Sequence, residues 1–93
     1  MTEPLKLDDQ NAFITELKSR ALGQLMSMHS WMRREAEATD DQDRAHMHSL
    51  VSYCSGALGI YITIISDITG ESLGDLYREV YIAYDAATGA MPI

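Results

Sequence analysis

Apolar residues recur every three or four positions along most of the chain, which is the spacing of amphipathic α-helices. Polar or glycine-containing breaks at 37–41, 69–72 and 88–92 divide this pattern into segments. We therefore predict an all-α fold, in which two long helices form an antiparallel hairpin and a shorter third helix packs against it. We expect one helical domain over 8–88.

The first segment begins near Asp8 or Asp9, since either carboxylate can cap a helix and suits its positive end. Its apolar stripe consists of Ile14, Leu17, Ala21, Leu25, Met28 and Met32. The residues that precede it, 1–7, are expected to form a flexible tail, as are residues 89–93 at the other end.

The second segment follows Thr39-Asp40-Asp41-Gln42, which has the pattern of a capping box, and Gly70 is placed to end it. Its predicted core face consists of Leu50, Cys54, Ala57, Tyr61, Ile64, Ile65 and Ile68. Ser72, with Asp75 three residues later, opens the third segment. The apolar stripe of that segment consists of Leu73, Leu76, Tyr77, Val80, Ala83, Tyr84 and Ala87.

Residues 59–65 are rich in β-branched and aromatic side chains and could form a strand instead. We favour a helix, because the helical period holds from Leu50 to Ile68. A single strand would also have no neighbour for its backbone hydrogen bonds.

The third segment is about half as long as the others and follows the second directly, so it should cover only the end of the hairpin away from Thr39. The half near this turn is then left with too many apolar residues for a lone hairpin. We predict a subunit or partner interface there, formed by Met26, Met28, His29, Trp31, Met32, Met47 and Val51. Met47, Leu50, Val51 and Tyr53 of the second segment should face the first segment across the hairpin. The alternative is that these side chains fill the core of a monomer, with Trp31 partly exposed.

Small residues line another face of the second segment, namely Ser52, Ser55, Gly56 and Gly59. A glycine inside a helix costs about 1 kcal/mol relative to alanine, so close approach of another helix is the expected compensation. The simplest partner is a second copy across a twofold axis, which predicts a dimeric helical bundle. The alternative is that the first or third helix packs against this face.

The net charge of −7, from 14 acidic and 7 basic residues, offers no cationic footprint for nucleic acid. It favours instead solubility, a protein partner with a basic surface, or mimicry of the charge of a nucleic acid. Asp40, Asp41 and Asp43 are candidate docking residues for such a partner, although acids at a helix start are most often solvated caps.

Cys54 is the single cysteine, so no internal disulfide can form and a reducing, cytoplasmic location is expected. The N-terminus lacks the apolar run of a signal peptide. Residues 49–66 carry no charge and approach the length of a membrane span. Because serines, glycines and tyrosines keep this stretch only modestly hydrophobic, we expect a buried soluble helix and no membrane partner.

The sequence contains no phosphate loop, no nucleophile with its base and no metal-ligand spacing that would specify an enzyme or a cofactor. We therefore predict a non-catalytic protein-binding module, a small acidic regulator, adaptor or inhibitor of the kind that phages and plasmids encode. An enzyme with an interhelical cleft around His29 or the basic residues is the alternative, and a membrane protein spanning at 49–66 is a third reading.

Overall fold

The computed structural model describes the backbone of residues 7–89 and the side chains from residue 9 to residue 89. Three helices account for nearly all of it: α1 (Leu7–Glu37), α2 (Asp41–Thr69) and α3 (Leu73–Thr88). The all-α fold is confirmed, and residues 59–65 are helical and lie within α2. The predicted tails lie outside the described residues, apart from Leu7, which opens α1, and Gly89, which caps α3.

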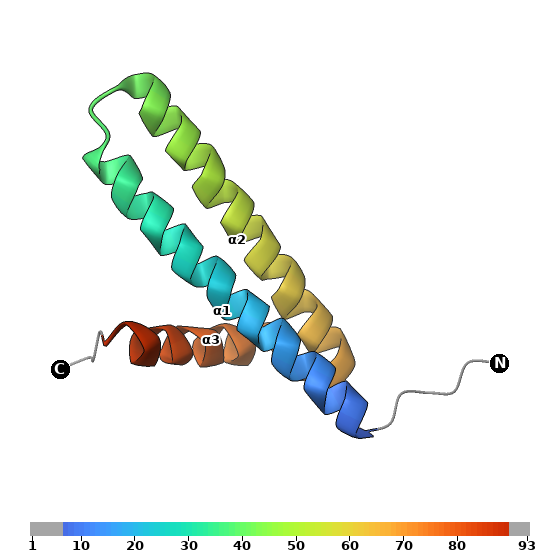
Figure 1. Cartoon of the computed structure of the whole chain (residues 1–93). Coiled ribbons are helices and arrows are strands. Elements are labelled where there is room, and N and C mark those ends of the chain that lie inside the picture. The colour runs from blue at the N-terminus through green and yellow to red at the C-terminus, as the bar shows by residue number, and fades with distance from the viewer. Residues whose placement is uncertain (1–6, 90–93) are drawn as a thin grey trace.

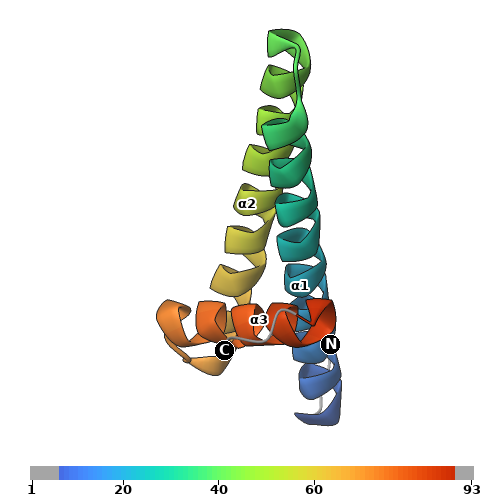
Figure 2. The ribbon, with the colours of Figure 1, turned by 90° about the vertical axis from the view of Figure 1, so that its left-hand side faces the viewer.

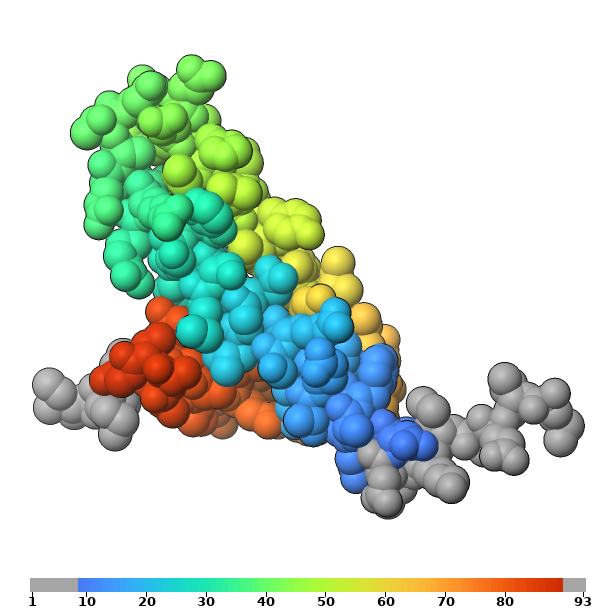
Figure 3. Space-filling model, in the orientation of Figure 1, coloured from blue at the N-terminus to red at the C-terminus, as the bar shows by residue number. Residues whose placement is uncertain are grey.

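Helices α1 and α2 run antiparallel and side by side, so they form the predicted hairpin (Figure 1). Helix α3 contacts the end of the hairpin away from the turn at 38–40, as expected. It crosses the two long helices steeply and does not run along them, which Figure 2 shows from the side. A crossing helix covers a shorter length of the hairpin than a parallel one would, so the end of the hairpin at the turn stays clear of α3 in Figure 3. Helix α3 nevertheless reaches into the turn-proximal half as far as His29, which contacts Tyr81 and Tyr84.

Local interactions fix the helix ends. Asp40 caps α2 by accepting a hydrogen bond from the Gln42 amide at 2.8 Å, so the cap lies one residue later than the capping box starting at Thr39 predicts. Gly70 ends α2 in the left-handed conformation, with φ at 75°, which a residue without a Cβ adopts at little cost. Ser72 caps α3 through the Asp75 amide, as predicted.

The core lies where the three helices meet. Its buried side chains are Leu17, Ala21, Leu25, Leu58, Ile62, Ile65, Leu76 and Val80. Cys54 is also buried, farther along α2. Helix α1 thus packs on an α2 stripe that contains Leu58 and Ile62.

The predicted core face of α2 was therefore partly wrong: Ile64 and Ile68 are exposed, and Leu58 and Ile62 take their place. Leu73 of α3 and Met32 of α1, which the apolar stripes placed in the core, are exposed as well. The physical reason is that α2 carries apolar residues around most of its circumference, so its periodicity alone does not fix which side α1 covers.

Candidate interaction surfaces

The Met/Trp surface, defined as Met26, Met28, His29, Trp31, Met32, Met47 and Val51, is only partly open. Met26 and Met32 are 42% and 44% exposed. Met28 is half-buried and packs against the core, so its main role is to stabilise the fold and not to contact a partner. Met47 and Val51 are half-buried on α2. The described chain therefore leaves two thioether side chains, not the whole set, free for a partner.

Trp31 is half-buried, but a residue of its own helix covers it. The guanidinium carbon of Arg34 lies 4.9 Å from the centroid of the Trp31 ring. Such a cation–π contact covers one face of the indole. The exposed side chains beside Trp31 on α1 remain accessible to a partner.

His29 joins α1 to α3. Its ring stacks on Tyr84, with centroids 4.7 Å apart, and meets the edge of Tyr81 at 6.3 Å. Its Nε2 atom is buried and has no hydrogen-bond partner among the described residues. His29 therefore packs between α1 and α3. Because it is half-buried, only the remaining part of its side chain could contact a partner, as the predicted interface requires.

The small residues of α2 are divided between two neighbours. Ser52, Ser55 and Gly56 are exposed. A Cβ atom built on Gly59 would lie 3.5 Å from the hydroxyl oxygen of Tyr77, whereas one built on Gly56 would meet nothing within 4 Å. Helix α3 thus uses the Gly59 end of this face, as the alternative reading allowed, and leaves the Gly56 end open.

A second apolar face of α2 was missed by the sequence analysis. Tyr53, expected to face α1, is 72% exposed, and Ile60 is 62% exposed. Together with Ile64 they lie around Gly56 on the outside of the hairpin. The uncharged run from Ser49 to Ser66 was the available signal, because a helix that buries one face needs no apolar residues on the other.

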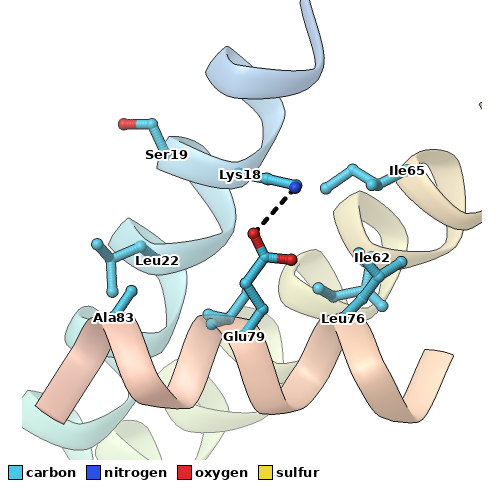
Figure 4. A pocket seen from close by; sticks show the side chains of 9 residues that line it. Lys18, Ser19, Leu22, Ile62, Ile65, Leu76, Glu79 and Ala83 are labelled. Carbon is cyan, nitrogen blue, oxygen red and sulfur yellow. Dashed lines mark hydrogen bonds and ion pairs between the residues drawn. The ribbon is translucent and has the colours of Figure 1, made fainter. Parts of the chain in front are cut away.

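An apolar hollow of about 230 Å³ lies where α3 crosses the hairpin, lined mainly by Leu22, Ile62, Ile65, Leu76, Val80 and Ala83 (Figure 4). Lys18 on α1 and Glu79 on α3 close one side of it, with Nζ 2.9 Å from Oε1. His29 does not line it. The charged groups pair with each other, so the hollow offers shape and apolar contact but no assembled acid–base or nucleophilic set.

Elsewhere on the hairpin, Arg20 donates to Glu16 at 3.0 Å and lies near Tyr61. The hydrogen bond to Glu16 is the main cause that raises the pKa of Arg20 above its ordinary value, and the nearby Tyr61 acts in the same direction.

The acidic residues at the turn mostly stabilise the turn itself. Asp40 is the α2 cap, and Asp41 accepts from Arg44 at 2.9 Å. Arg44 also donates to the carbonyl oxygen of Ala38 at 2.9 Å, which ties α2 back to the end of α1. Asp43 is exposed in the first turn of α2.

Within residues 9–89, no group of three or more His, Cys, Asp or Glu side chains is arranged to hold a metal ion. Cys54 is a free, buried thiol. By length and composition α2 could cross a membrane, a test that core helices of soluble proteins also pass. Only 22% of its apolar window is buried, so the expectation of a buried helix over 49–66 was wrong for most of this stretch, because α1 and α3 leave its outer face uncovered.

Comparison with known proteins adds no relationship: no family model, no curated protein and no solved structure matches this chain.

Proposed function

We propose that this chain is a non-catalytic protein-binding module, a small acidic helical regulator, adaptor or inhibitor that works as a homodimer. The observation that supports the proposal is that large apolar side chains stay on the surface of both long helices, outside a core that is complete without them. Met32 on α1 and Tyr53 on α2 are the clearest examples. Adaptable methionine and buried aromatic side chains are favoured in protein interfaces.

The surface divides into two parts with different charge. The outer face of α2 is uncharged between Ser49 and Ser66 and suits a second copy of the same acidic chain. The Met26 and Met32 side of α1 lies toward the turn, where Asp41 and Asp43 are exposed. That combination suits a different protein with an apolar patch and a basic rim.

Photo-crosslinking in the native host tests the proposal. A benzophenone amino acid at Met32 should yield one covalent adduct with a protein whose purified form binds this chain. Met32→Ser should weaken that binding at least tenfold, whereas Phe13→Ser should not, because Phe13 is equally exposed (47%) at the far end of α1. The absence of any adduct at Met32 and at Tyr53, combined with a monomer at every concentration in light scattering, would contradict the proposal.

A further inference from the structure

The outer face of α2 has a seven-residue repeat that alternates large and small side chains. The large positions are His46, Tyr53 and Ile60, and the small positions are Ser49, Gly56 and Thr63. Spacings of three and four place all six in one stripe, which winds around the helix by about 20° per seven residues, and all six are exposed. A stripe of this kind is the seam by which one helix packs against another.

Helix α3 deepens this stripe at one end. Leu73 and Tyr77 form a wall beside it, so that a hollow of about 360 Å³ opens around Gly56, Gly59, Ile60, Thr63 and Ile64. The floor at Gly56 is bare, because a Cβ atom there would meet nothing within 4 Å. One face thus carries both projecting side chains and a space of suitable shape to receive them.

The hydroxyl groups at two of the small positions, Ser49 and Thr63, are already hydrogen-bonded within α2. The Ser49 hydroxyl donates to the carbonyl oxygen of Ala45 at 3.1 Å, and the Thr63 hydroxyl donates to that of Gly59 at 2.8 Å. Burial of these two hydroxyl groups therefore leaves neither donor unpaired, which lowers the cost of covering the small positions.

We propose that this stripe binds the same stripe of a second copy, with the two α2 helices antiparallel about a twofold axis between Gly56 and Ile60. In this register each Ile60 enters the space over the second copy's Gly56, and each Tyr53 lies over the second copy's Thr63, beside Leu73. The arrangement rests on the homodimer in the proposed function and specifies its geometry. In each of these pairs, one of the facing side chains is large and the other is small. The two helix backbones can therefore approach closely.

Charge selects the antiparallel orientation. The stripe continues to Asp67 at one end and starts near His46 at the other. Parallel helices would set Asp67 against Asp67, and Gly56 against Gly56 with a void between them. Antiparallel helices bring Asp67 toward Ser49 and His46 of the second copy. The neutral segment Ser49–Ser66 also keeps the other charges of two acidic chains away from the contact.

The stripe is long enough to form a small specific interface. From His46 to Asp67 the stripe is about 30 Å long, at 1.5 Å per residue. Stable dimers bury about 800 Å² on each partner, and one helix pair with the edge of α3 lies at the lower end of that range.

A lipid surface is a less suitable occupant. Helix α1 packs beside α2 along the hairpin and carries charged side chains such as Glu16, Arg20 and Arg33 on its exposed side. Insertion of α2 into a bilayer would bring these charges into the hydrocarbon, at a cost of several kcal/mol.

Light scattering over a range of concentrations gives the first test. Gly56→Leu fills the space for Ile60 and should raise the dimer dissociation constant at least tenfold. Gly23→Leu is the matched control, since Gly23 is also a helical glycine with nothing within 4 Å, but lies on α1. The control should dimerise like the wild type. Circular dichroism of both variants verifies that they remain helical, and equal dimerisation of the two would overturn the proposal.

Disulfide trapping tests the register in a Cys54→Ala background. A mixture of Tyr53→Cys chains and Thr63→Cys chains should form a mixed disulfide, whereas each variant alone should not. A dimer that crosslinks through Tyr53→Cys alone is parallel and overturns the proposal. A dimer with no crosslink uses another face, which overturns the register and leaves the protein-binding function intact.

Vesicle flotation with neutral and anionic phospholipids completes the test. The wild type should remain with the soluble fraction. Flotation that Gly56→Leu abolishes, without a dimer in solution, would assign the stripe to a lipid surface and overturn the proposal.

Discussion

The imidazole ring of His29 lies on the phenol ring of Tyr84, with centroids 4.7 Å apart and planes inclined by 26°. This contact links α1 to the second half of α3, beyond Val80, which is the last buried side chain of α3. Because α3 crosses the hairpin steeply, few side chains hold it there, and each one has a measurable effect.

His29→Phe should therefore stabilise the fold by about 1 kcal/mol, because it keeps the ring contact and removes the buried Nε2 atom that has no partner among the described residues. His29→Ala should destabilise it by about 1 kcal/mol through loss of the stacked ring. Urea unfolding measures both. His46→Ala, on an exposed side chain, is the control and should change the free energy of unfolding by less than about 0.5 kcal/mol. A loss of stability in His29→Phe would contradict this view of the contact.

Ile60 and Ile62 lie two residues apart on different faces of α2. Ile62 is fully buried, so Ile62→Ala should cost about 2–5 kcal/mol and bring the chain close to unfolding. Ile60→Ala should leave the stability of the monomer within about 0.5 kcal/mol of the wild type and weaken only self-association. Thermal unfolding at low protein concentration separates the two effects. Equal destabilisation by both substitutions would show that Ile60 belongs to the core.

The hollow under Lys18 and Glu79 offers room for a larger side chain. Ala83 lines it, so Ala83→Leu should add buried apolar surface and stabilise the chain by about 1–2 kcal/mol, at about 0.8 kcal/mol per methylene. Ala86→Leu places the same side chain at an exposed position and should have little effect. Urea midpoints compare the two variants. A destabilised Ala83→Leu would mean that the hollow closes in solution and is overpacked by the leucine.

Gly70 and Gly74 flank the α2–α3 connection and should respond oppositely to alanine. Gly70 has φ at 75°, so Gly70→Ala should cost about 1–2 kcal/mol. Gly74 is helical with nothing within 4 Å, so Gly74→Ala should gain about 0.4–1 kcal/mol. Melting temperatures should move in opposite directions, and a shift of the same sign would contradict the assigned backbone conformations.

The sequence alone determined the features that depend on neighbouring residues. The helical period, the Ser72 cap and the αL glycine at Gly70 need only a few adjacent positions, because their hydrogen bonds close within one turn. They were sufficient to predict three helices, their approximate ends and a hairpin, and they decided correctly between strand and helix at 59–65.

Only the tertiary structure decided how each helix is rotated about its own axis. Helix α2 has apolar side chains on two faces, and the sequence assigned Ile64 to the core and Tyr53 to the inside of the hairpin. Packing of α1 against Leu58 and Ile62 selected the other face and left the stripe around Gly56 outside. The steep crossing of α3 likewise follows from side-chain contacts between distant segments, such as His29 with Tyr84, which no local pattern contains.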